Sequence, residues 1–227
     1  KEYRRQRQMC IRDSCNDSNY AGVHDAKDAI CHELGTPGQW AQLVGETLKR
    51  YSGDNELRVD MGHFGRADLH VADQLRKAGL DGAAADHPYS LQVAVDETET
   101  AEFLKAMKAY PANLYADLSN YDTLRDDRLR AAFRGEISKL VAQNPHLASQ
   151  LMYGTDWFMN MQEANPYLTS FQEVIDAAYA RNFFGGNAAR YLGLARGRPT
   201  RRRLEKFYDR WNLKTAPRWM QLVDALG

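Results

Sequence analysis

Residues 151–158 read LMYGTDWF, an apolar run that ends close to a carboxylate. The apolar residues 151–153 together with Trp157 are typical of a buried strand, which puts Asp156 at the C-terminal tip of that strand. An ionised aspartate in such a place costs free energy unless it is paired, hydrogen-bonded or bound to a metal. The alternative is that Asp156 caps the helix that follows. The segment predicts a strand with an acid at its end.

Two more segments have the strand pattern. Residues 57–65, LRVDMGHFG, alternate apolar and polar side chains and carry His63 at their C-terminal end. Residues 113–119, NLYADLS, carry Asp117 and Ser119 toward their exit. Apolar side chains at helical spacing predict helices over residues 39–51, 67–78, 97–109, 126–144, 170–181 and 187–192. Strands that alternate with helices of this kind predict βαβ units and a parallel sheet.

Polar side chains gather at the C-terminal ends of all three predicted strands, as His63, Asp117, Ser119 and Asp156. In barrels and open α/β sheets alike, ligands bind at that edge. Neither GxGxxG nor GxxxxGK[ST] occurs in the chain, which disfavours a nucleotide-binding sheet. For Asp117 two interpretations stay open. It accepts hydrogen bonds from the residues that form the site, or it faces outward and caps a helix.

Composition narrows the classes of partner. In the 227 residues, thirty Lys and Arg balance thirty Asp and Glu, so no whole-molecule field favours nucleic acid or an anionic membrane. No apolar run approaches the roughly 18 residues that a membrane span needs. Three cysteines, an odd number without CxxC spacing, favour a reducing compartment. We expect a cytoplasmic protein with neither a nucleic-acid nor a membrane partner.

Four segments together resemble the amidohydrolase superfamily, in the amidohydrolase-related branch of small-molecule hydrolases and decarboxylases. They are residues 40–65 (WAQLVGETLKRYSGDNELRVDMGHFG), 110–122 (YPANLYADLSNYD), 151–158 (LMYGTDWF) and 183–194 (FFGGNAARYLGL). The resemblance implies an α/β fold, the (β/α)8 TIM barrel. The segments correspond in order to strands six, seven and eight and to the closing helix.

The resemblance also implies roles for two residues, both catalytic and both metal ligands. Asp156 matches the strand-eight aspartate, which binds the metal and takes a proton from the attacking water. His63 matches the strand-six histidine, a second-metal ligand in binuclear members and a polarising group in mononuclear ones. The implied cofactor is a divalent metal, with zinc expected, because such an ion lowers the pKa of bound water to about 7.

The chain departs from the family in its N-terminal part. No HxH pair occurs anywhere, although the family carries one on strand one. The strand-five histidine should come just before residues 15–20, CNDSNY, where residues 1–14 (KEYRRQRQMCIRDS) show neither periodicity nor turn chemistry. We expect residues 1–14 to be a non-native leader, with an ordinary disordered arm as the alternative. Residues 15–195 are then the C-terminal half of a barrel, inactive without the rest of its parent protein.

The implied activity is hydrolysis of an amide, lactone or related carbonyl bond of a small molecule by metal-activated water. Non-oxidative, metal-dependent decarboxylation is the alternative within the same branch. A further metal reading rests on a group of side chains at helical spacing near the N-terminus, although such groups are usually solvated faces: His24, Asp25, Asp28, His32 and Glu33.

Residues 196–227 follow as an Arg-rich linker, RGRPTRRR, and a helical tail. The arginines could contact phosphates, but Glu205 and Asp209 beside them make a solvated linker the preferred interpretation over a nucleic-acid-binding module. We expect residues 203–226 to pack on the barrel helices or on a partner subunit in a homo-oligomer. The packing side chains are predicted to be Leu204, Phe207, Trp211, Trp219 and Leu222.

Overall fold

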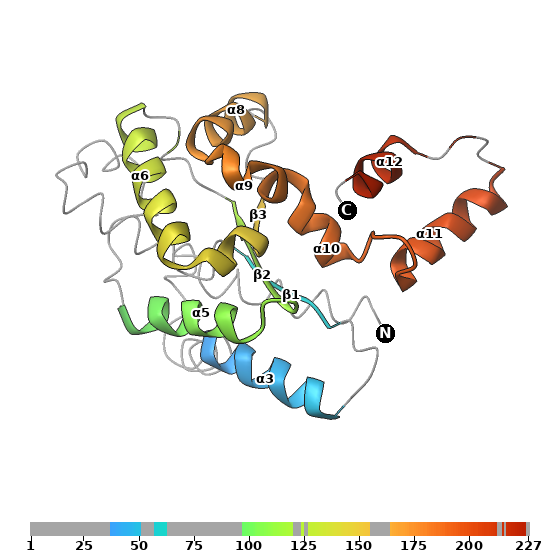
Figure 1. The fold of residues 1–227 in the computed structure, drawn as a ribbon, viewed down its shortest axis with the longest axis horizontal. Helices are drawn as coiled ribbons and strands as arrows, with labels where there is room; N and C mark the ends of the chain where they lie inside the picture. Colours follow the sequence, from blue (N-terminus) through green and yellow to red (C-terminus); the bar gives the residue numbers. More distant parts are fainter. Residues whose placement is uncertain are drawn as a thin grey trace, which may run out of the picture.

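A three-stranded parallel sheet lies at the centre of the computed structural model (Figure 1), which describes residues 37–50, 57–62, 97–119, 124, 127–154, 164–212, 215 and 217–225. The strands are β1 (Val59–Met61), β2 (Leu114–Leu118) and β3 (Leu151–Tyr153). They stand in the order β1-β2-β3, and both neighbouring pairs are parallel. The three strands expected from the sequence are confirmed, each slightly shorter than its segment.

The register gives the sheet two chemically different faces. Val59 pairs with Leu114 and Ala116 with Leu151, and these apolar side chains belong to one continuous core. Residues paired in register share a face, and successive residues alternate between faces. The opposite face carries Asp60, Tyr115, Asp117 and Met152.

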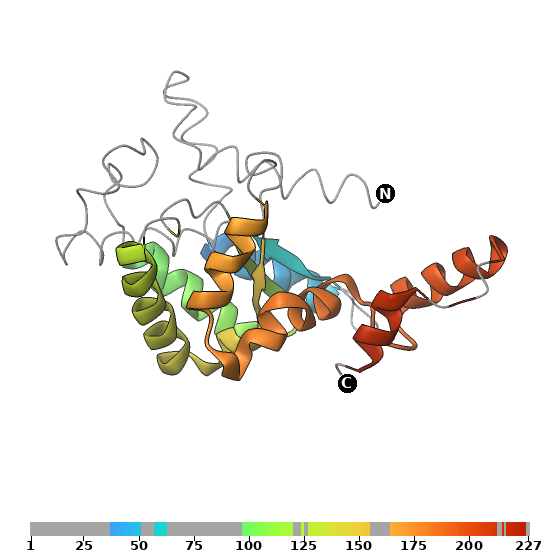
Figure 2. The ribbon, with the colours of Figure 1, turned by 90° about the horizontal axis from the view of Figure 1, so that it is seen from above.

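Helices cover the apolar face. They are α3 (Pro37–Arg50), α5 (Glu97–Ala109), α6 (Asp127–Gln143) and α8 (Ala164–Val174). Their core side chains include Val44, Phe103, Phe133 and Phe171, all fully buried with the strands. Figure 2 shows the same helices from above, gathered around the sheet. The predicted helices over residues 39–51, 97–109 and 126–144 agree with α3, α5 and α6.

The helix predicted over residues 170–181 is wrong, because the structure has two helices there. Helix α8 ends at Val174, and α9 (Ala177–Arg181) begins after Asp176, whose side chain accepts a 2.8 Å hydrogen bond from the amide of Ala178. This side-chain cap satisfies an amide that a continuous helix would pair internally. A short π-helical turn, η6 (Asn182–Gly186), then leads into α10 (Asn187–Leu192), and a 3₁₀ turn, η5 (Pro145–Ser149), precedes β3.

The tail is helical from further upstream than expected. Helix α11 (Pro199–Arg210) begins inside the predicted linker, since proline suits the first turn of a helix, where its missing amide is not needed. Helix α12 is Arg218–Asp224. Figures 1 and 2 both show α11 and α12 extending to one side of the sheet-containing part.

The prediction that the tail packs on the rest of the chain is wrong for three of its five side chains. Phe207, Trp211 and Leu222 are 53%, 65% and 56% exposed, whereas Leu204 and Trp219 are half-buried. Helical spacing identified an apolar stripe but could not show whether the chain covers it. Packing of these side chains on a partner subunit stays a prediction.

Several sequence expectations lie outside the described residues: the leader 1–14, the group from His24 to Glu33, the helix over 67–78, and Trp157. Within the described part, none of the helices combines the length and apolar character required to cross a bilayer.

Candidate functional site

The two expected catalytic residues, His63 and Asp156, lie outside the described residues. The structure describes the strands that lead to them, since β1 ends at Met61 and β3 ends at Tyr153. Between these two strands stands β2, whose C-terminal end carries the other polar candidates, Asp117 and Ser119. The described part of the site is therefore its central strand and the edge around it.

Asp117, Ser119 and Gly154 form a tight group at this edge. The Ser119 hydroxyl donates a hydrogen bond to Oδ1 of Asp117, and the Gly154 amide donates to the carbonyl of Leu118 over 3.4 Å. A Cβ on residue 154 would lie 2.6 Å from Oδ1 of Asp117 and 2.9 Å from Cβ of Ser119. Glycine thus lets the end of β3 approach the Asp117 carboxylate, two positions before Asp156 in the chain.

Sequence reasoning missed this role of Gly154. The available signal was a glycine directly after a strand, which often marks a close approach of backbone to another group. The partner of that approach, Asp117, lies 37 positions away and depends on the register of β2 and β3.

A tyrosine from α10 lies against the polar face of the sheet. The Tyr191 ring packs on Tyr115 with ring centroids 5.5 Å apart. Burial, then the negative charge of Asp60 and more weakly that of Asp117, raises the pKa of Tyr191 well above its ordinary value, although Arg58 opposes the shift. The Tyr191 hydroxyl therefore stays protonated near neutral pH, so it can donate hydrogen bonds and cannot act as a base.

Helix α10 is fixed at the opposite, N-terminal end of the strands. Asn187 donates from Nδ2 to the carbonyl of Leu151 over 2.6 Å and to that of Ala148 over 3.1 Å. Arg58, directly before β1, donates to the carbonyl of Tyr191. Gly193 ends the helix with a φ of +66°, a conformation that favours glycine, and a Cβ there would lie 2.7 Å from Arg58 Nη2. Helix α10 thus joins the starts of β1 and β3.

The described residues do not form a metal site by themselves. Nowhere in the described part of the chain do three or more His, Cys, Asp or Glu side chains gather closely enough to hold an ion. Asp117 brings one carboxylate to the edge, whereas a structural zinc ion takes four ligands and a catalytic one three plus water. The expected metal ligands are His63 and Asp156, on which the structure gives no geometry.

Comparison of the chain with protein-family models, with curated proteins and with solved structures finds no match in any of the three. The likeness to amidohydrolases therefore rests on the four sequence segments.

Proposed function

We propose that the chain is part of a metal-dependent hydrolase of the amidohydrolase type, in which residues 15–195 supply the C-terminal half of a (β/α)8 barrel. One observation carries most weight: three parallel strands in chain order converge on an edge where a hydrogen-bonded carboxylate, Asp117, lies against the end of β3. Ligands of parallel α/β proteins bind at this edge. The segment containing Asp156 continues from the same strand end.

In this proposal Asp156 and His63 hold a divalent ion, with zinc expected. A bound ion of this kind lowers the pKa of its water to about 7 and polarises a carbonyl. With such an ion bound, the Asp156 carboxylate would accept a proton from water, and the His63 imidazole would bind or orient the reacting groups. Ser119 donates a hydrogen bond to the Asp117 carboxylate, which can accept further hydrogen bonds from groups at the same edge.

The proposed substrate is a small molecule with an amide, lactone or related carbonyl bond, and the proposed setting is the cytoplasm. Three cysteines without metal-type spacing fit a reducing compartment. Decarboxylation without oxidation uses the same residues, and the products separate the two reactions because only decarboxylation releases carbon dioxide.

The test uses the protein translated from the whole gene. We expect about one or two divalent ions per chain by elemental analysis, together with hydrolysis of carbonyl substrates. Asp156→Ala and His63→Ala should each remove most of the metal and the activity, while Asp209→Ala, at an exposed position of α11, should retain both. A metal-free protein, or full activity in the Asp156→Ala variant, would contradict the proposal.

A further inference from the structure

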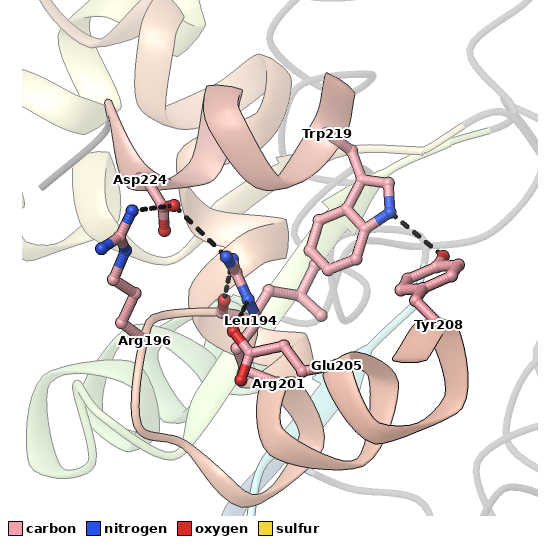
Figure 3. A network of polar contacts seen from close by, with 7 residues as sticks. All are labelled: Leu194, Arg196, Arg201, Glu205, Tyr208, Trp219 and Asp224. Carbon is pink, nitrogen blue, oxygen red and sulfur yellow. Dashed lines mark hydrogen bonds and ion pairs between the residues drawn. The ribbon is translucent and has the colours of Figure 1, made fainter. Parts of the chain in front are cut away.

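A buried arginine joins the two tail helices (Figure 3). Arg201 of α11 is only 4% exposed. Its guanidinium donates to Glu205 over 2.7 Å and to Asp224 of α12 over 3.2 Å. The ring of Trp219 lies 5.3 Å from the guanidinium carbon, within range of a cation–π contact, and its indole donates to the Tyr208 hydroxyl over 3.4 Å. These contacts show which side of α11 faces α12.

Two further contacts fix this pair of helices. Arg196 donates to Asp224 over 2.8 Å and holds the pKa of that carboxyl below its ordinary value, so the pair is charged near neutral pH. Arg181 of α9 donates to the carbonyl of Ala225, which ties the end of the tail to the rest of the fold. Figures 1 and 2 show α11 and α12 extending to one side of the sheet-containing part. The tail is therefore a defined helical unit that projects from that part.

One side of α11 carries exposed apolar side chains. Phe207 and Trp211, one turn apart, have ring centroids 6.2 Å apart and are more than half exposed. At 100° per residue the half-buried Leu204 lies on the same side of the helix. Asp209, midway between Phe207 and Trp211 in the chain, lies on the opposite side. We call Leu204, Phe207 and Trp211 the tail stripe.

Cations border the tail stripe and acids do not. Arg203 and Arg210 are both exposed, and each lies within about 60° of Phe207 around the helix axis. Glu205 lies on the side that faces α12, where it pairs with Arg201. Helix α11 thus separates an apolar stripe with a cationic border from its acidic side chains.

Positive charge is concentrated in the tail. Residues 196–227 contain nine Lys and Arg against three Asp and Glu, a formal charge of +6, whereas residues 1–195 contain twenty-one against twenty-seven. In the part of 1–195 that the structure describes, the numbers are eleven Lys and Arg against ten Asp and Glu. The tail is therefore a cationic unit beside a described part that is nearly neutral.

We propose that the tail docks on the surface of an anionic phospholipid bilayer. The tail stripe enters the headgroup region, and Arg203 and Arg210 contact the negative headgroups. A helix that has Trp, Phe and Leu on one side and Lys and Arg on the rest lies in the plane of such a surface. The positive tail complements the charge of anionic lipids, which attract basic segments within a Debye length. The docking is independent of the proposed catalytic function, since no residue of the tail takes part in it.

The balance of charge over the whole chain predicts no membrane partner, and the proposal departs from that expectation. Exposed charges act over about 10 Å at 0.1 M salt, so headgroups at the tail respond to the charge of the tail and not to the sum. A single-stranded nucleic acid would stack on the two aromatic rings, but Leu204 offers it no ring. A second copy would bring two tails of +6 together, and these repel each other.

The test is co-sedimentation of the full chain with lipid vesicles. One set of vesicles contains phosphatidylserine and phosphatidylcholine in equal parts, and the other contains phosphatidylcholine alone. We expect the chain to bind the anionic vesicles about tenfold or more tightly than the neutral ones. Binding should weaken between about 0.1 M and about 1 M NaCl, where the Debye length falls from about 10 Å to about 3 Å.

Variants assign the binding to the tail stripe and its cations. The double variant Phe207→Ala, Trp211→Ala should weaken binding to anionic vesicles by about tenfold or more, because two aromatic side chains no longer leave water. Leu43→Ala, at a half-exposed position of α3, should not change it. Arg210→Glu should also weaken binding by about tenfold. Lys139→Glu on α6, with the same change in net charge, should not.

The absence of vesicle binding overturns the proposal. Equal binding to the two kinds of vesicle, or equal binding by the double variant and the native chain, overturns it too. Titration with a single-stranded oligonucleotide and sedimentation equilibrium without lipid complete the experiment. If the chain does not bind vesicles but binds the oligonucleotide, or forms a dimer, and the double variant does not, the tail stripe belongs to that partner and the membrane docking is wrong.

Discussion

At the scale of single residues, Gly154 occupies a position at the described sheet edge that leaves no room for a side chain. A methyl group there would lie 2.6 Å from a carboxylate oxygen of Asp117. We predict that Gly154→Ala destabilises the protein by about 1–3 kcal/mol, because the neighbouring strand ends must move apart. Chemical denaturation measures the change in the free energy of unfolding.

Gly135 provides the matched control for this substitution. It lies within α6, and a Cβ there would meet nothing within 4 Å. Gly135→Ala should stabilise the protein by up to about 1 kcal/mol, because alanine favours the helix. If the two variants unfolded at the same denaturant concentration, Gly154 would not be sterically restricted.

Gln150 is a second residue whose side chain makes buried hydrogen bonds between distant parts of the chain. Fully buried before β3, it donates from Nε2 to the carbonyls of Met107 and Leu114 over 2.9 and 2.8 Å. The side-chain oxygen of Gln150, Oε1, lies 2.9 Å from Nδ1 of His146. We predict that Gln150→Ala costs about 2–4 kcal/mol of unfolding free energy, since buried carbonyl groups lose their partners.

Thermal or denaturant unfolding tests this prediction. Gln143, an exposed residue at the end of α6, is the control, and Gln143→Ala should change stability by no more than about 0.5 kcal/mol. Equal effects of the two substitutions would mean that the Gln150 hydrogen bonds do not stabilise the fold.

Some of these residues could be predicted from the sequence and others could not. Asp117 and Ser119 could be predicted as polar residues at the end of a strand, because they lie in or directly after that strand in the chain. The burial of Arg201 could not be predicted, and the arginines were interpreted as a solvated linker. Its partner Asp224 lies 23 positions away and Trp219 lies 18 positions away, so only the tertiary fold shows them together.

At the scale of elements, the identity of the strands followed from local pattern, whereas the helix ends did not. Each predicted strand combined apolar side chains with a polar exit, and each has its counterpart in the sheet. The break between α8 and α9 depends on one hydrogen bond to the Asp176 side chain, which apolar spacing cannot detect. Helix α11 starts at a proline that looked like part of a linker.

The tail helices should separate when Arg201 is replaced. We predict that Arg201→Gln increases amide hydrogen exchange in α11 and α12 by about tenfold or more, because the bonds to Glu205 and Asp224 and the contact with Trp219 are lost together. Arg202→Gln, at the exposed neighbouring position, should leave exchange unchanged. Exchange rates that match in the two variants would show that Arg201 does not hold the helices.

At the scale of the whole molecule, net charge gives only the sum of the charges. The balance of thirty against thirty argued against a nucleic-acid or anionic-membrane partner, which stays a prediction that the vesicle experiment tests, while the charges are unequally distributed between residues 1–195 and 196–227. An interaction between exposed charges extends over about 8 Å at physiological salt, less than the size of the molecule, so regional charge governs binding. The described residues form a three-stranded sheet, and the eight-stranded barrel stays a proposal.

Zinc affinity is the whole-molecule property that tests the ligand count. Only His63 and Asp156 match ligand positions of the resemblance, and the chain lacks an HxH pair. Because zinc sites take three or four protein ligands, we predict that the 227-residue chain binds no stoichiometric zinc with a Kd of about 1 μM or below. Calorimetric titration together with elemental analysis measures this, and the protein translated from the whole gene, which the proposed function expects to bind zinc, is measured beside it. Tight stoichiometric binding by the 227-residue chain would contradict the prediction and would mean that other side chains, such as His24 or His32, complete the site. The variants His24→Ala and His32→Ala would then identify the missing ligand by their loss of zinc.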